Sequence, residues 1–177
     1  MTSSGEIPVH SEAARQRSKA TWDAAATGWY AQREELWESS RSVSEWMIRR
    51  LDPQPGDTIL ELAAGLGDTG LRAARLVGGS GCIIITDFAP EMVGAACRRA
   101  EEMGVENAEF RTLDAERMDL ETNSVDGVLC RWAYMLMIDP AAAFAETRRV
   151  LRPGGRLAFS VWAARERNPA LSLAGMV

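Results

Sequence analysis

The chain has little cysteine and histidine, and each shortage excludes a class of site. Its 177 residues contain 3 cysteines and 1 histidine. Cys82, Cys97 and Cys130 are odd in number and far apart, and none belongs to a Cys-x-x-Cys pair, so neither a disulfide framework nor a zinc site is indicated. His10 lies in a polar N-terminal stretch, which leaves the rest of the chain without an imidazole for catalysis or metal binding. We therefore expect no metal.

Long apolar runs and an excess of positive charge are also missing. No stretch approaches the roughly 20 apolar residues that a membrane-spanning helix needs, and residues 1–20 lack the apolar centre of a secretion signal. The formal charge of -5 and a pI near 5.0 argue against a protein whose main task is to bind phosphate backbones. We expect a cytoplasmic protein with no membrane span and no nucleic-acid partner.

The N-terminal third of the chain predicts helices rich in tryptophan. We interpret residues 1–11 as a disordered polar tail and residues 12–51 as a helical cap of two or three helices. Prolines in "DPQPGD", residues 52–57, end this cap. The cap carries four tryptophans at nearly helical spacing, of which Trp37 and Trp46 are expected in the core.

From residue 52 onward, short apolar runs alternate with helical patterns. The runs that predict strands are 58–62, 82–88, 108–113, 124–130 and 156–162, and the helical patterns are 69–77, 90–104 and 140–151, the last ended by an "RPGG" turn. This alternation predicts an α/β fold, a doubly wound Rossmann-like parallel sheet of about five strands preceded by the N-terminal helices. The fifth strand would form an unprotected edge, through which we expect self-association.

The loop after the first predicted strand is the most informative segment. "ILELAAGLGDTG", residues 59–70, contains G-x-G-x-x-G at Gly65, Gly67 and Gly70, a pattern typical of a loop that cradles a dinucleotide pyrophosphate. Glu61, four residues before Gly65, would be unfavourable beside a phosphate and suits a positively charged ligand. Gly70 is better interpreted as a position where the helix packs on the strand. An NAD(P)-dependent oxidoreductase remains an alternative.

The same segment resembles motif I of the class I S-adenosylmethionine-dependent methyltransferases, an acidic residue, an apolar residue and then G-x-G-x-G. The acid falls on Glu61, Ala63 replaces the first glycine, and the other two fall on Gly65 and Gly67. The family's next motifs are matched in order by "ITDFAPEMV", "TLDAERM", "SVDGVLCRWA" and "ETRRVLRPGGRLAFS". The resemblance covers about residues 22–162. It is closest to the small-molecule branch with the ubiquinone and menaquinone C-methyltransferases, methyltransferase types 11 and 25.

This resemblance implies a methyltransferase that uses S-adenosylmethionine and a small organic methyl acceptor. The implied cofactor-binding residues are Glu61, Ala63, Gly65, Gly67, Asp87, Phe88, Met92, Asp114, Ala115 and Arg131. Among them, Asp87 would take the ribose hydroxyls, Asp114 and Ala115 the adenine edge, and Arg131 would lie near the methionine. Trp22, Trp29, Tyr30 and Trp132 are implied for the acceptor pocket. No catalytic residue is assigned.

The family fold has seven strands, so the resemblance implies that residues 52–177 form an S-adenosylmethionine-binding domain that is incomplete at its C-terminus. A chain that binds the cofactor without performing the reaction is therefore a further alternative. A base, where the acceptor needs one, would be a carboxylate or a tyrosine such as Tyr134.

For several of these residues, an ordinary structural role is the alternative to a role in ligand binding. Asp87 also suits the turn that starts the next helix, and Glu61 a strand-end carboxylate bonded to backbone amides. Asp114 also suits a solvated loop. Arg131 also suits a surface pair with Asp126 or Asp139, and any one tryptophan suits the core.

Overall fold

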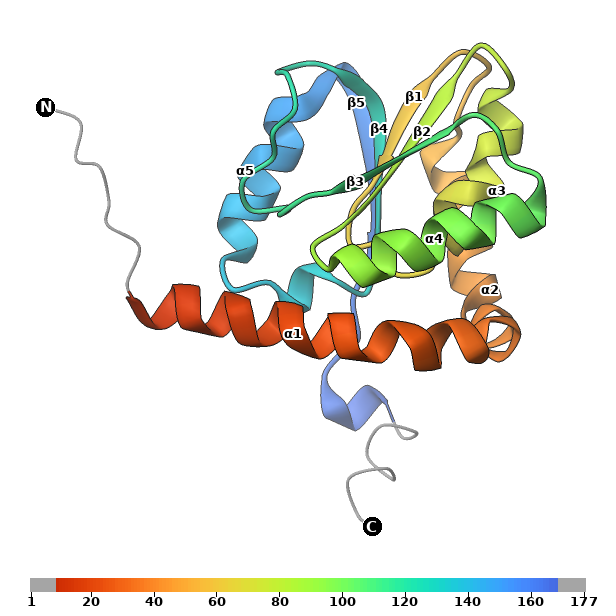
Figure 1. The fold of residues 1–177 in the computed structure, drawn as a ribbon. Coiled ribbons are helices and arrows are strands. Elements are labelled where there is room, and N and C mark those ends of the chain that lie inside the picture. Colours follow the sequence, from red (N-terminus) through yellow and green to blue (C-terminus); the bar gives the residue numbers. More distant parts are fainter. Residues whose placement is uncertain (1–8, 169–177) are drawn as a thin grey trace, which may run out of the picture.

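Five parallel strands form the centre of the fold, which Figure 1 shows as a computed structural model describing residues 9–168. The strands are β1 (Thr58–Glu61), β2 (Cys82–Asp87), β3 (Ala108–Thr112), β4 (Val125–Arg131) and β5 (Leu151–Ser160). They pair in the order β3-β2-β1-β4-β5, and every pair is parallel. The predicted doubly wound sheet is confirmed. Its order reverses between β1 and β4, where such sheets bind their ligands.

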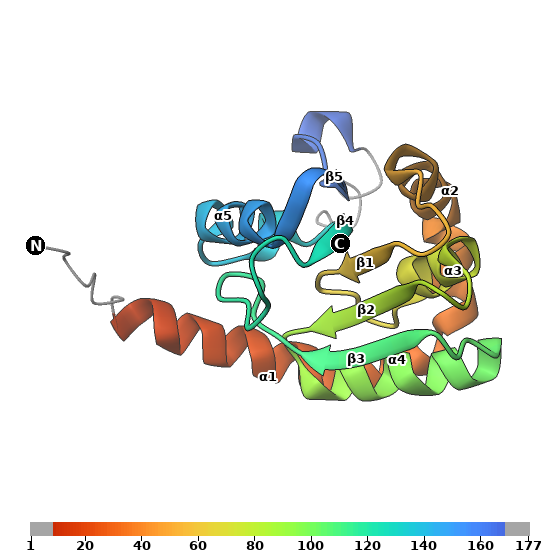
Figure 2. The same cartoon turned by 90° about the horizontal axis from the view of Figure 1, so that it is seen from above.

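Helices cover both faces of the sheet and cross its end. The helices are α1 (Val9–Ala31), α2 (Arg33–Leu51), α3 (Asp68–Val77), α4 (Pro90–Met103), η1 (Tyr134–Leu136), α5 (Pro140–Val150) and η2 (Arg165–Arg167). Figure 2 shows α2, α3 and α4 on one face and α5 on the other. In Figure 1, α1 runs below the carboxyl ends of the strands. These are the ends at which β5 continues toward the C-terminus. In residues 9–168 no helix is long and apolar enough to cross a membrane.

The two faces of the sheet carry separate apolar cores because side chains alternate along each strand. Ile59 of β1 joins the core beneath α2 and α3, whereas its neighbour Leu60 joins the core beneath α5. β1 lies in the middle of the sheet, and both of its faces are buried. Such burial on both faces explains why β1 and β2 contain consecutive apolar residues in the sequence.

Two boundaries differ from the expectation. Helix α1 begins at Val9, inside the stretch 1–11 expected to be a tail, and residues 1–8 lie outside the described part. Strand β5 begins at Leu151, so the "RPGG" segment is not a turn before the strand but part of it. The pairing of β5 with β4 shifts register between Val125 and Gly127. A bulge there accommodates the extra residues, and Gly154 takes a φ of +85° within it.

The two tryptophans expected in the core of α2 have different surroundings. Trp37 is buried, and the guanidinium of Arg72 lies 3.2 Å from its ring centroid. Trp46 is 45% exposed, so its predicted burial is wrong. Its neighbour Met47 takes the inward position on α2, and the helical step of about 100° per residue turns Trp46 outward.

Candidate functional site

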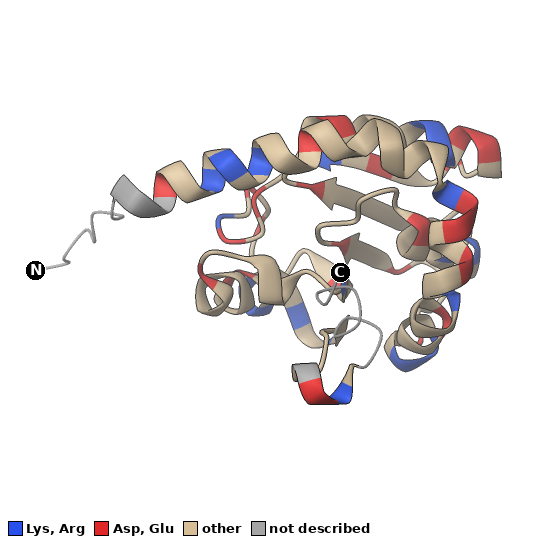
Figure 3. Cartoon of the chain, turned by 90° about the horizontal axis from the view of Figure 1, so that it is seen from below, with Lys and Arg blue, Asp and Glu red and all other residues tan. Residues whose placement is uncertain are grey.

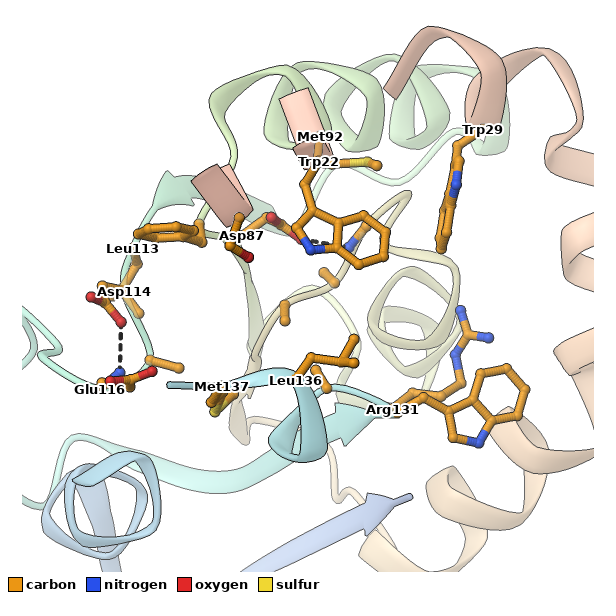
Figure 4. Close-up of a pocket in the computed structure, with 18 of the residues that line it drawn as sticks. Trp22, Trp29, Asp87, Met92, Leu113, Asp114, Glu116, Arg131, Leu136 and Met137 are labelled. Carbon is orange, nitrogen blue, oxygen red and sulfur yellow. Dashed lines mark hydrogen bonds between the residues drawn. The ribbon is translucent and has the colours of Figure 1, made fainter. Parts of the chain in front are cut away.

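A cavity lies at the carboxyl ends of β1, β2 and β4, beneath α1, and Figure 4 shows most of its lining. Four regions contribute to it: α1 and α2, the β1–α3 loop, the residues after β2 and β3, and the segment after β4. The lining residues are Arg15, Ser18, Trp22, Trp29, Leu36, Ser39, Ser40, Ala63, Ala64, Gly65, Asp87, Phe88, Met92, Leu113, Asp114, Ala115, Glu116, Arg131, Trp132, Ala133, Leu136, Met137 and Ile138. The cavity therefore coincides with the reversal of strand order.

The β1–α3 loop turns tightly because three of its residues take left-handed backbone conformations. Ala63, Gly65 and Gly67 have φ values of +48°, +57° and +74°. Gly65 lines the cavity, and a Cβ on it would lie 3.5 Å from the Trp29 ring. Gly67 caps α3 and packs against Ala96 instead, so it is not part of the cavity wall. Ala63 does line the cavity, in a conformation that strains a residue with a Cβ.

Asp87, the last residue of β2, fixes the geometry of this loop. Its Oδ2 accepts a hydrogen bond from the Gly65 amide and its Oδ1 from the Ala89 amide, both at 2.9 Å. The carboxylate is nearly buried yet lines the cavity. Burial raises its pKa, although the two amide donors act in the opposite direction. Asp87 therefore orders the turn that leads into α4, which is the structural role expected for it. Its carboxylate also lines the cavity, where a ligand can reach it.

Glu61 lies beneath the cavity rather than in its wall. Its Oε2 accepts a hydrogen bond of 2.9 Å from the Gly70 amide in the first turn of α3, and its side chain is buried. This is the strand-end carboxylate bonded to a backbone amide, and Glu61 is absent from the lining. A Cβ on Gly70 would lie 2.5 Å from Glu61 Oε2, which confirms Gly70 as a packing position.

Replacing Glu61 by glutamine is expected to flatten the pH dependence of stability between about pH 4.5 and 7. Burial raises the pKa of Glu61 from 4.5 to about 7 in the folded chain. As the pH rises through this window the unfolded state loses its proton first, so the free energy of unfolding falls, by about 3 kcal/mol for this group. Above pH 7 the contribution is constant.

Urea denaturation of both proteins at pH 5 and pH 8 measures this effect. Glutamine keeps an oxygen acceptor for the Gly70 amide, so the comparison isolates the titration. If the wild-type chain and the variant lose the same stability between the two pH values, Glu61 does not titrate in this window.

Arg131 is the cation of the cavity that lacks a hydrogen-bond or ion-pair partner. Its side chain makes no hydrogen bond or ion pair within residues 9–168, and its buried Nε lacks an acceptor. The guanidinium carbon lies 5.0 Å from the Trp132 ring centroid. Burial lowers the pKa of Arg131, opposed by the charges of Glu61 and Asp68. The alternative surface pairs are not formed, because Asp126 pairs with Arg152 and Asp139 caps α5.

Trp132 lies beside Arg131 in a strained backbone conformation. Its φ is +57°, a region that non-glycine residues seldom adopt. The Trp132 amide donates to the Ser160 carbonyl at 2.8 Å, and its ring stacks on Trp162 with centroids 4.7 Å apart. These contacts hold the residue at the cavity wall, as predicted for it.

Asp114 lines the opposite part of the cavity and is not a solvated loop acid. Its Oδ2 accepts from Arg15 Nη1 and its Oδ1 from the Glu116 amide, both at 2.9 Å. Three further predicted cofactor residues, Phe88, Met92 and Ala115, also belong to the lining. Figure 4 shows Asp114 and Glu116 on one side of the cavity and Arg131 on the other.

The aromatic residues of α1 divide between the cavity and the surface. Trp22 and Trp29 line the cavity and pack edge to face, with ring centroids 5.4 Å apart. The structure does not bring Tyr30 to the cavity. Its hydroxyl bonds Glu102 at 2.7 Å, because the helical step from Trp29 to Tyr30 turns the next side chain away. Tyr134, a candidate base, is buried outside the lining, and its hydroxyl bonds Thr147.

Sequence reasoning missed about half of the cavity wall. The missed residues are Arg15, Ser18, Leu36, Ser39, Ser40, Ala64, Leu113, Glu116, Ala133, Leu136, Met137 and Ile138. Ala64, Leu113, Glu116 and Ala133 lie inside the matched motifs, so assigning every motif residue to the site, rather than selected ones, would have found them. No local pattern marks Arg15, whose partners lie about a hundred positions along the chain.

Comparison with known families and proteins gives a consistent match. The family model described as a methyltransferase domain matches residues 59–155. The ubiquinone/menaquinone biosynthesis C-methyltransferase of Acidiphilium cryptum is 38% identical over 110 residues, which cover 62% of this chain and 43% of that protein. The aklanonic acid methyltransferase of a Streptomyces species is 33% identical over 118 residues, covering 64% of this chain and 54% of that protein. The chain thus spans about half the length of these relatives.

The fold has counterparts among solved structures. A SAM dependent methyltransferase from Aquifex aeolicus superposes with a TM-score of 0.69, over 78% of this chain and 76% of that chain. The sequence identity is 24%, so this likeness concerns the fold.

Proposed function

Because the chain belongs to the methyltransferase domain family, whose model matches residues 59–155, we propose that it is an S-adenosylmethionine-dependent methyltransferase acting on a small organic molecule. The observation that carries the proposal is the cavity at the strand-order reversal, with carboxylates on one side and an unpartnered Arg131 on the other. S-Adenosylmethionine has matching groups, an adenine and ribose hydroxyls at one end and a carboxylate at the other. The residues present therefore fit this cofactor.

Each wall of the cavity then has a role toward the cofactor. Asp87, already bonded to two amides, retains carboxylate lone pairs for the ribose hydroxyls. Asp114 accepts from the adenine amino group, with Phe88 and Met92 against the ring. Arg131 pairs with the carboxylate of the methionine part, which supplies the partner that the buried Nε lacks.

The cofactor supplies an activated methyl group on a sulfonium, a good leaving group that becomes a neutral thioether. The chain has to align the acceptor and exclude water, which is worth up to about 7–11 kcal/mol of barrier in well-oriented reactions. Trp22 and Trp29 present aromatic rings to the cavity, and such rings attract a cation. The described lining has no histidine, so proton removal is left to the acceptor's own acidity or a carboxylate.

The apolar wall formed by the segment after β4 favours an apolar acceptor. Trp132, Leu136, Met137 and Ile138 follow β4, and Leu36 approaches from α2. The two curated relatives are named for ubiquinone/menaquinone biosynthesis and for aklanonic acid. We extend this class, small organic molecules with a large apolar surface, to the acceptor of this chain. Self-association through β5 and a cytoplasmic location remain predictions.

The oxidoreductase alternative has no support in the family match or in the relatives named above. A dinucleotide would bring the two negative charges of its pyrophosphate to a loop held by Asp87, with Glu61 directly beneath it. The one cation of the described lining that is free to pair is Arg131. This charge balance disfavours a phosphate-bearing cofactor.

Calorimetric titration of the chain with S-adenosylmethionine, S-adenosylhomocysteine and NAD tests the proposal. We expect both adenosyl compounds to bind with one site per chain and NAD to show no binding at the same concentrations. Incubation with a radiolabelled methyl donor and a panel of quinols, phenols and amines then identifies the acceptor. Selective binding of NAD would refute the proposal, and donor binding without any transfer would favour a chain that binds the cofactor only.

A further inference from the structure

A buried ion cluster joins α1 to the wall of the cavity that carries Asp114. Arg15 of α1 donates from Nη1 to Asp114 Oδ2 at 2.9 Å and from Nη2 to Glu116 Oε2. The Arg15 and Glu116 side chains are 9% and 5% exposed. Figure 3 shows the basic part of α1 lying over the acidic loop that follows β3. One guanidinium therefore holds two carboxylates that are nearly adjacent in the sequence.

The cluster extends from Asp114 to the apolar wall. Glu116 donates its amide to Asp114 Oδ1 at 2.9 Å, and its Oε1 accepts from the Ile138 amide at 2.8 Å. Arg15, Asp114, Glu116 and Ile138 all line the cavity. Without Arg15, the part-buried Asp114 carboxylate and the buried Glu116 carboxylate would lie close together without a counter-charge, and their repulsion would favour rotation of one side chain away from the other.

A carboxylate distinguishes an amino group from an oxygen only if it is charged and held in place. Asp114 has about four lone-pair positions, of which Arg15 and the Glu116 amide use two. The bond to Arg15 fixes the orientation of this carboxylate and places a positive charge beside it. The remaining positions are then available as acceptors in the cavity wall.

We propose that Arg15 is a positioning residue for recognition of the adenine amino group, acting through Asp114. The inference rests on the proposed function, because it requires an adenosyl cofactor in this cavity. It assigns to α1 a part in reading the nucleobase, in addition to covering the cavity. Loss of Arg15 should remove the distinction between a 6-amino and a 6-oxo purine.

The test measures the affinities of S-adenosylhomocysteine and S-inosylhomocysteine, its 6-oxo counterpart, by calorimetry. The wild-type chain is expected to prefer the amino compound by about tenfold to hundredfold, the factor for one mismatched hydrogen bond. In the Arg15→Met variant the preference should fall below about threefold. Arg15→Lys, which keeps a charge near Asp114, should restore part of it.

Arg17→Met is the matched control. Arg17 lies on the same helix, is exposed and makes no side-chain hydrogen bond or ion pair within the described residues, so this variant should keep the wild-type preference. A merely structural role for Arg15 would weaken both ligands by the same factor and leave their ratio unchanged, which would overturn the inference. A wild-type chain that binds both ligands equally would also overturn it while leaving the proposed function standing. Failure of the wild-type chain to bind either ligand would refute both.

Discussion

Replacing Gly70 by alanine is expected to lower the free energy of unfolding by about 1–3 kcal/mol, because α3 packs on the sheet at this residue. An added Cβ would lie 2.5 Å from Glu61 Oε2 and 2.6 Å from Ile85 Cδ1. Both side chains are buried, and Glu61 cannot withdraw without losing its hydrogen bond to the Gly70 amide. The gain of up to about 1 kcal/mol that alanine brings to a helix is therefore outweighed.

Gly94→Ala is the control for this substitution. Gly94 also lies within a helix, α4, but a Cβ there would meet only the Arg98 guanidinium, at 3.8 Å. We expect this variant to be more stable than the wild type by about 0.5–1 kcal/mol, the ordinary effect of alanine in a helix. Urea denaturation of the two variants measures both effects. Equal stabilisation by the two substitutions would show that α3 can move away from the sheet without cost.

The sequence predicts the strands that form a short apolar segment between helical patterns. β1, β2 and β4 in the middle of the sheet, and β3 at its edge, each begin and end within one residue of their predicted bounds. Burial on both faces gives β1 and β2 consecutive apolar residues, whereas β3 is predicted although most of its residues are exposed. β5 is an edge strand with exposed residues and a bulge, so its first half, residues 151–155, lacks such an apolar segment.

Site residues that belong to a short sequence motif were predictable. Site residues whose contacts lie far away in the sequence were not. Gly65 lies in the loop after β1 and Asp87 ends β2, both in recognisable segments, and the structure brings them into contact. Glu61 belongs to the same motif, yet whether its carboxylate faces the cavity or α3 depends on the packing at Gly70. Arg15 contacts residues 99 and 101 positions away, and such contacts leave no trace in local sequence.

Asp87→Ala is expected to weaken cofactor binding by about 1–3 kcal/mol, which is roughly a tenfold to hundredfold rise in Kd. The proposed ribose hydroxyls lose their acceptor. The Gly65 and Ala89 amides also lose theirs, so the β1–α3 loop that forms the cavity wall is released. Stability should fall as well, because the buried Ala89 amide is left unpaired and the Gly65 amide loses its acceptor.

Asp126→Ala is the control for lower stability. If Asp87→Ala lost cofactor affinity only because the fold is less stable, another variant of similar stability would lose the same affinity. The Asp126 carboxylate accepts from the Thr58 amide at 2.8 Å and pairs with Arg152, at the amino ends of β1 and β4. Like Asp87, it is a strand carboxylate that accepts from a backbone amide of another segment, but it lies at the end of the sheet away from the cavity. We expect Asp126→Ala to lower the free energy of unfolding without changing the Kd for S-adenosylhomocysteine. If both variants bind the ligand as the wild type does, Asp87 only starts α4 and the ribose lies elsewhere.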